Sequence, residues 1–329
     1  MKKFFYFLFI LSFGICILSC DESFDPYGTF MDKYVLNCII RGDTTFQTAT
    51  VTQDYQVLNL EPLSNSKDPN IYGTIIRIWN GNDKVAKMRD TTIQRQANDL
   101  YKTPYALYYT NNFQPESQSE LQIEAILPNG KRLTSVTNTP SAVNMIYKEC
   151  DLLIPAVLST GSNDLIHYAW HSDQQNPVYI IRLSINYFKN ENLNKIKKTM
   201  VIPLNYLQYN DSYLPNYAKP LNTGSYKVDM ATITRAMQLI SEGDPDKASY
   251  EIMGCVLEIL SLDQNLSSYY NSTTRSNDLF SVKLNETDYS NIQGGYGIFG
   301  VYMKTYFVSY FRHQYLQTFG YTPGSDEGR

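Results

Sequence analysis

The sequence predicts a mostly β protein, with a β-sandwich at its N-terminal side, a larger β-rich domain after it, and one or two short helices. Tyrosine is unusually frequent, with 28 residues against 2 tryptophans, and tyrosine and β-branched residues favour strands. Apolar and polar residues alternate over many short runs, which is the pattern of half-buried strands. Turn signals rich in Asn, Gly and Pro separate these runs, as hairpins require.

The first twenty residues have the pattern of a secretory signal. Lys2 and Lys3 give a positive start, residues 4–17 form a mostly apolar run without a charge, and a small residue and a cysteine end it. The run is shorter than the ~20 residues that a spanning helix needs. The alternative, a buried cysteine at the end of a membrane helix, fits the flanks and the length less well. We therefore expect residues 1–19 to be a signal peptide.

The end of this signal, Ile-Leu-Ser-Cys, resembles a bacterial lipobox. The resemblance implies cleavage before Cys20, which becomes the lipid attachment residue and holds the protein to the outer membrane through more than one acyl chain, as stable anchoring requires. Residues 20–30 are then a lipidated tether. Its acidic residues Asp21 and Glu22 resemble the surface-export signals of Bacteroidota lipoproteins. Whether the protein faces the periplasm or the cell surface stays open.

Charge and cysteine content exclude several classes of function. The formal net charge is −4, so the chain lacks the basic surface of a nucleic-acid-binding protein. Cys38, Cys150 and Cys255 lie far apart and form no C-x-x-C pair for zinc or redox chemistry. We interpret them as small buried hydrophobic residues. Whether any two of them form a disulfide stays open.

The first domain is expected over residues 31–140 as a series of short strands. These are predicted at residues 34–40, 46–55, 71–79, 84–88, 121–127 and 131–137. Asn80-Gly81 and Asn129-Gly130 are strong hairpin signals, because both central positions of a type I′ turn need φ > 0. Short strands with turns at this spacing are typical of a β-sandwich.

The second domain is expected over residues 146–321. Residues 178–188 alternate as a half-buried antiparallel strand should. A helix is predicted with Asp229 as its N-cap, and Ser261 and Gln264 have the spacing of a capping box that opens a second, short helix. Further strands are predicted at residues 152–157, 165–170, 198–207 and 250–260.

The last predicted strand, residues 296–311, is apolar on both faces, so we expect it at the centre of the second domain's sheet. Residues 322–329 are expected to be a flexible tail. Gly295, Gly297 and Gly300 match the dinucleotide-binding fingerprint, but a strand follows them where that motif requires a helix. We interpret Gly294, Gly295 and Gly297 as residues that allow a tight turn or bulge into this strand, and predict no cofactor.

His167 and His171 lie four residues apart, and Asp173 would share their side of a strand, so half a metal site is conceivable. Two partly exposed histidines at a strand end are the simpler interpretation, and we predict no metal. No carboxylate pair stands out for glycoside hydrolysis, although two such acids need only be adjacent in space.

Three segments resemble a family of uncharacterised Bacteroidota outer-membrane lipoproteins. They are residues 113–140, with the sequence LQIEAILPNGK, and residues 259–270 and 291–300. Where the family often has Gly-x-x-Tyr before its strand, this chain has Glu116-Ser-Gln-Ser119. The resemblance implies an immunoglobulin-like first domain and a TonB-dependent transporter as a candidate partner, and it implies no enzymatic activity.

Tyr206, Tyr209, Tyr213 and Tyr217 cluster in an Asn- and Pro-rich segment and form the candidate binding surface. Tyrosine supplies rigid amphipathic area and asparagine adaptable hydrogen bonds. The alternative is that these tyrosines simply pack over strands and loops.

The leading hypothesis is a non-enzymatic cell-envelope lipoprotein that acts as an accessory binding or docking component at the outer membrane. The second is a surface glycan-binding lipoprotein for nutrient capture. The third is a hydrolase with an unrecognised carboxylate pair.

Overall fold

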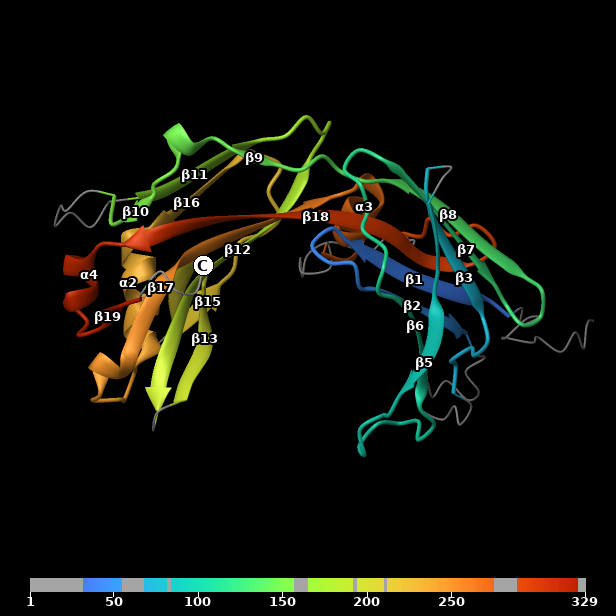
Figure 1. Cartoon of the computed structure of the whole chain (residues 1–329), viewed down its shortest axis with the longest axis horizontal. Coiled ribbons are helices and arrows are strands. Elements are labelled where there is room, and N and C mark those ends of the chain that lie inside the picture. The colour runs from blue at the N-terminus through green and yellow to red at the C-terminus, as the bar shows by residue number, and fades with distance from the viewer. Residues whose placement is uncertain are drawn as a thin grey trace, which may run out of the picture.

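Two hydrophobic cores organise the chain, and one long strand, β18 (Tyr296–Phe311), contributes to both (Figure 1). The computed structural model describes residues 32–54, 68–81, 84–156, 165–191, 194–209, 212–274 and 289–324. The predicted signal peptide, Cys20 and the tether lie outside these described residues. The prediction of a mostly β fold with a few short helices is confirmed.

The first lobe, which comprises β1 to β8, is a sandwich of two facing layers. One layer has the strand order β1-β2-β6-β5, and the other is a separate sheet with the order β4-β3-β7-β8. These orders correspond to A-B-E-D and C′-C-F-G of an immunoglobulin-like sandwich. The bounds are β1 (Tyr34–Arg41), β2 (Gln47–Gln53), β3 (Ile75–Asn80), β4 (Lys84–Lys87), β5 (Arg89–Ile93), β6 (Tyr105–Thr110), β7 (Glu120–Ile126) and β8 (Arg132–Asn138).

Alternating apolar side chains fill the space between these two layers. Leu36 and Val51 come from one layer and Ile123 from the other, and all three are buried. Residues two apart on a strand share a face, so the pattern that predicted the strands also predicted the core. Both expected hairpins form, β3 with β4 and β7 with β8. Gly81 and Gly130 adopt positive φ angles of 61° and 81° in the turns.

The second lobe surrounds the other core with two sheets and a helix. The order β13-β12-β17-β18 continues the long sheet, and β16-β11-β9 form a separate three-stranded sheet. Helix α2 (Met230–Ile240) packs Ile233, Ala236 and Met237 into this core, and its start after Asp229 agrees with the sequence prediction. The bounds are β9 (Asn144–Met145), β10 (Leu153–Ile154), β11 (Leu165–His171), β12 (Val178–Glu191), β13 (Asn194–Ile202), β16 (Ser225–Asp229) and β17 (Tyr250–Leu262), with 3-10 turns η3 (Tyr147–Glu149) and η4 (Lys247–Ser249).

Strand β18 has the predicted bounds, but its neighbours differ from the expectation of a strand within the second domain alone. Its first half pairs in parallel with β1, from Val35 opposite Tyr296 to Arg41 opposite Tyr302. Its second half pairs antiparallel with β17. The physical reason is length: sixteen residues extend about 50 Å, enough to cross from one core to the other.

Helix α3 (Gln264–Thr274) begins beside the point where β18 changes partner. The predicted capping box is wrong at its first residue. Asp263 is the N-cap, because its Oδ1 accepts the backbone N–H of Leu266 at 2.7 Å. The Ser261 hydroxyl instead donates to the side chain of Gln174 at 3.0 Å. Since Ser261 still belongs to β17, it lies too early to cap the helix.

The C-terminal end of the described chain is more ordered than a free tail. A third helix, α4 (His313–Gln317), was not predicted. After it, β19 (Thr322–Pro323) pairs with β17, and Gly324 donates its N–H to the carbonyl oxygen of Ile252 at 2.8 Å. Residues 325–329 lie outside the described residues.

The three described cysteines, Cys38, Cys150 and Cys255, are free thiols. Cys38 and Cys255 are fully buried, and burial raises the pKa of both thiols to about 12. Within the described parts of the chain, no helix is long and apolar enough to cross a bilayer.

Candidate functional site

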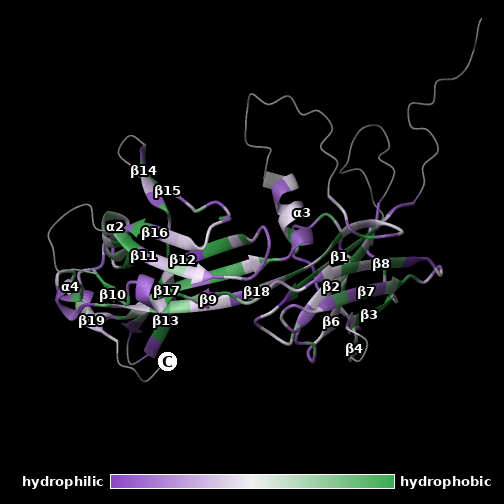
Figure 2. Ribbon diagram, turned by 90° about the horizontal axis from the view of Figure 1, so that it is seen from above, coloured by the Kyte–Doolittle hydropathy of each residue, from purple (hydrophilic) through white to green (hydrophobic). Residues whose placement is uncertain are grey.

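The predicted tyrosine cluster lies on a β-hairpin that projects from the second lobe (Figure 2). The hairpin consists of β14 (Asn205–Tyr209) and β15 (Ser212–Asn216), which pair only with each other among the described strands. Leu207 lies opposite Leu214, and Gln208 opposite Tyr213. Since directly opposite residues share a face, the two leucines lie on one face and Tyr206 and Tyr213 on the other.

The structure brings three of the four tyrosines into one neighbourhood. The Tyr213 ring lies 5.5 Å from the guanidinium of Arg235 on α2. Burial and the nearby Tyr217 raise the pKa of Tyr206. The Tyr209 side chain is not among the described ones. The face with Tyr206 and Tyr213 therefore contacts α2 through Tyr213, although that side chain stays 52% exposed.

The sequence analysis missed the apolar face of the same hairpin. Leu207 and Leu214 are 53% and 52% exposed. Asn210-Asp211 between two Tyr-Leu pairs is a turn signal, and it could have predicted this hairpin in place of one strand over residues 198–207. Reading the register from that turn would have placed the two leucines opposite each other.

A second candidate is a polar cavity between the lobes, which we call the interlobe cavity. Its volume is about 670 Å³, within the ~300–1,000 Å³ of small-molecule sites. It is lined by Gln118, residues 136–141, residues 173–175 and residues 263–265. These segments come from both lobes: the first two belong to the β7–β8 side of the sandwich, and the others follow β11 and open α3.

Asp263 is a buried residue of the cavity lining that hydrogen-bonds to both α3 and β8. One carboxylate oxygen caps α3 and the other accepts the hydroxyl of Thr137 on β8. Burial raises the pKa of Asp263 to about 6, although these hydrogen bonds and one to the Val301 backbone partly offset the effect. Because both carboxylate oxygens already accept hydrogen bonds, Asp263 holds α3 against β8 and is poorly placed to act as a catalytic acid.

Two of the amide side chains in the interlobe cavity are held in fixed orientations. Gln174 donates to the carbonyl oxygen of Leu262 at 2.7 Å and accepts from Ser261. Asn265 donates to the carbonyl oxygen of Val136 at 3.1 Å and accepts the hydroxyl of Tyr289 at 2.7 Å. Each of these two amides is therefore held through both its nitrogen and its oxygen.

A groove of about 490 Å³ lies at the start of β1, beside α3. Its lining includes Tyr269, Tyr289 and Tyr296. The Lys33 ammonium lies 4.9 Å above the Tyr296 ring, and the Lys33 backbone N–H donates to Asp54 at 2.6 Å. Lys33 and Asp54 of this groove thus already have partners within the protein.

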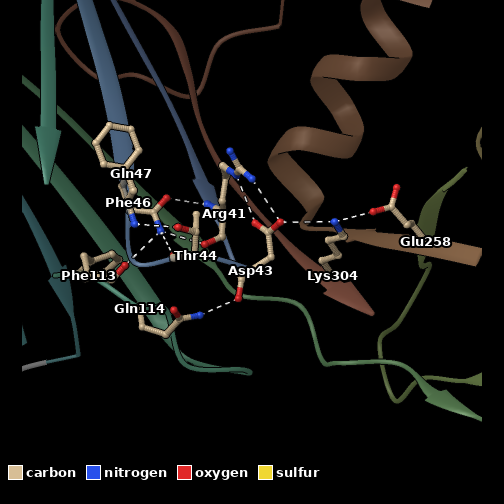
Figure 3. A network of polar contacts seen from close by, with 10 residues as sticks. Arg41, Asp43, Thr44, Phe46, Gln47, Phe113, Gln114, Glu258 and Lys304 are labelled. Carbon is tan, nitrogen blue, oxygen red and sulfur yellow. Dashed lines mark hydrogen bonds and ion pairs between the residues drawn. The ribbon is translucent and has the colours of Figure 1, made fainter. Parts of the chain in front are cut away.

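Ion pairs of alternating sign connect the lobes on one face of the long sheet (Figure 3). Arg41 binds Asp43 with two hydrogen bonds of 3.2 and 3.3 Å, and the Lys304 ammonium lies 3.6 Å from Asp43 and 2.6 Å from Glu258. Glu258 also pairs with Arg182. Burial opposes ionisation of Glu258, but the hydrogen bonds from Lys304 and Arg182 outweigh it and lower its pKa.

His167 and His171, the conceivable half metal site, both lie on β11. His171 contacts Asp173 at 3.1 Å on the surface, and the backbone N–H of His167, four residues earlier, binds Asp151. Among the described residues, no group of three or more His, Cys, Asp or Glu could hold a metal ion.

The glycines around the start of β18 have the structural role that their context predicted. A Cβ at Gly295 would collide with the carbonyl oxygen of Tyr34, and one at Gly297 with that of Leu36. Gly297 also has a φ of +113°, which side chains rarely adopt. These glycines allow β18 to approach β1 closely.

Comparison with known proteins adds no assignment, because no family model and no curated protein matches this chain.

Proposed function

We propose that this protein is a lipid-anchored cell-envelope lipoprotein that acts, without catalysis, as an accessory binding or docking component at the outer membrane. A TonB-dependent transporter is the candidate partner. The observation that carries the docking role is the projecting β14–β15 hairpin, with Leu207 and Leu214 side by side and more than half exposed. Exposed apolar groups that gather on a projecting element mark interaction sites more often than scattered ones.

Aromatic side chains around the hairpin support the same role. Tyr213 and Tyr217 are each more than half exposed, and tyrosine is enriched at protein–protein interfaces. The Arg235 guanidinium beside Tyr213 adds a residue type that is frequent among the side chains contributing most to binding. The tyrosines would flank the contact, and the two leucines would form its apolar centre.

The anchor and the hairpin are tested separately. Cys20→Ala should abolish lipidation and move the protein from the membrane fraction to the soluble one. If this variant still partitions into detergent like the wild type, the lipid anchor is wrong, whatever the hairpin does.

The docking role is tested by photo-crosslinking in the native membrane. A photoreactive residue at position 207 should crosslink to an outer-membrane transporter, and Leu207→Ser with Leu214→Ser should abolish capture of that transporter. Leu100→Ser is the matched control, because Leu100 is 52% exposed on the first lobe. Crosslinks of equal yield at positions 100 and 207 would contradict a specific docking hairpin.

The second candidate function is glycan capture for nutrition. The observation that favours it is the interlobe cavity, whose lining is dominated by amides and hydroxyls.

A further inference from the structure

We propose that the interlobe cavity is a binding site for a neutral, polyhydroxylated ligand, namely a short saccharide. The inference concerns a surface distinct from the docking hairpin and does not depend on the lipid anchor. Its ligand class follows from the six carboxamide side chains that converge on the cavity from four separate chain segments: Gln118, Asn138, Gln174, Gln175, Gln264 and Asn265.

Carboxamides match the hydrogen bonding of sugar hydroxyls. Each offers two N–H donors and a carbonyl acceptor, and a hydroxyl both donates and accepts. The buried hydroxyls of Thr139 and Ser141 in the same lining already bond within the protein. Asp173 adds an exposed carboxylate acceptor. A ligand covered with hydroxyl groups can therefore pair with the lining amides that are exposed, namely Gln118, Asn138, Gln175 and Gln264. An apolar ligand would bury them without a hydrogen-bond partner, at a cost of about 1–3 kcal/mol per buried group.

Other ligand classes fit this lining less well. An anion would meet the carboxylate of Asp173, and none of the described lining residues is a lysine or arginine. A peptide needs apolar pockets for its side chains, and here the apolar lining is Val136 and Pro140. The lining thus favours a small neutral ligand over either.

The cavity is partly preorganised for such a ligand. The hydrogen bonds of Gln174 to β17 and of Asn265 to β8 fix two amides before any ligand arrives, which lowers the entropy that binding costs. Gln118 has a positive φ of 58°. A non-glycine residue held in this region stores strain that often marks a ligand site.

The lining residues come from both lobes, so a bound ligand would bridge the two lobes. Asn138 belongs to the first lobe, and Gln175 and Gln264 to the chain on the other side of the cavity. A saccharide that bridges them stabilises the folded protein, because the unfolded chain does not bring these residues together.

The experiment is NMR titration of the soluble mature protein with maltose, cellobiose, mannobiose, xylobiose and N,N′-diacetylchitobiose. At least one should bind with a dissociation constant near or below about 1 mM and shift the amide signals of residues 136–141, 173–175 and 263–265. The triple variant Asn138→Ala, Gln175→Ala, Gln264→Ala should weaken that binding at least about tenfold.

The matched control removes three amides elsewhere: Gln208→Ala, Gln238→Ala and Gln314→Ala, all exposed. It should bind like the wild type. The proposal is overturned if none of the five sugars binds, if the shifts map to the hairpin or to the groove near Tyr296, or if both triple variants bind equally. Since residue-resolved shifts come from the wild type, the test does not depend on the variants folding.

Discussion

The two halves of β18 lie in different surroundings, although they form one strand. In the first half, Phe299 and Val301 are fully buried in the core of the sandwich. In the second half, Phe307 and Phe311 are buried in the core of the second lobe. Between the cores, Tyr306 is 68% exposed. The strand therefore contributes to the cores of both lobes, and the side chain of Tyr306 between them belongs to neither.

The first lobe is therefore not built from one continuous segment of the chain. Strand β18 pairs beside β1 in its sheet, and the Ile298 N–H donates to the side chain of Asn37, which lies 261 positions earlier in the sequence. Closing such a loop costs conformational entropy before any contact forms. The pairing of β1 with β18 can therefore form only once this distant segment has reached the sandwich, and we expect folding to be slow.

Truncation after Gln293 is the most severe way to test whether both lobes need β18. It removes the strand from both cores, and losing several large apolar side chains at ~1.5–3 kcal/mol each rivals a domain's total stability of ~5–15 kcal/mol. We expect both lobes to unfold or aggregate, as circular dichroism and gel filtration would show. Truncation after Gly324 is the control and should behave like the full chain. A shorter chain with a cooperatively folded sandwich would contradict the shared role.

Single substitutions can measure separately how much each half of β18 contributes to stability. Phe299→Ala and Phe307→Ala should each cost about 3–5 kcal/mol, because both rings are buried. Hydrogen exchange should locate the first loss in the sandwich and the second in the other lobe. Tyr306→Ala is the control between them and should change the stability by less than about 0.5 kcal/mol. Identical exchange patterns for the two phenylalanine variants would mean that the lobes unfold as one unit.

The sequence predicted local features far better than pairing between distant segments. Alternation predicted β12, a run that is apolar on both faces predicted β18, and the Asn-Gly turns predicted the hairpins of the sandwich, because all three signals are local. The sequence could not show that Tyr296 pairs with Val35, because no local pattern indicates which distant strand a given strand pairs with. The interlobe cavity was missed for the same reason: Gln118, Gln175 and Gln264 are ordinary loop and cap residues until the fold brings them together.

Asp263 provides a pH test of the contact between α3 and β8. Burial raises its folded pKa to about 6, above the ~3.9 of an exposed aspartate. The folded state therefore binds more protons than the unfolded state between these values, and this group makes stability fall as the pH rises from about 4 to about 6. The loss is at most about 3 kcal/mol.

The variant Asp263→Asn should flatten this pH dependence, because a neutral amide can still cap α3. Urea unfolding at several pH values between about 4 and 7 would measure it. Asp173→Asn, at the exposed carboxylate of the same cavity, should leave the slope unchanged. A slope that stays the same in Asp263→Asn would mean that another group titrates.

The smallest expected effect concerns the ion pairs that link the lobes at Lys304. Its side chain is partly exposed, and exposed ion pairs contribute ~0–1 kcal/mol that salt screens. Lys304→Met keeps the apolar stem and removes the charge, so Asp43 and Glu258 lose a shared partner while Arg41 and Arg182 still neutralise them. We expect a loss of stability below about 1 kcal/mol at low salt, which should vanish in ~1 M NaCl. Lys198→Met on β13, an exposed lysine with no ion pair to a described residue, is the control. If Lys304→Met costs several kcal/mol at every salt concentration, the ion pairs hold the two lobes together and β18 does not do so alone.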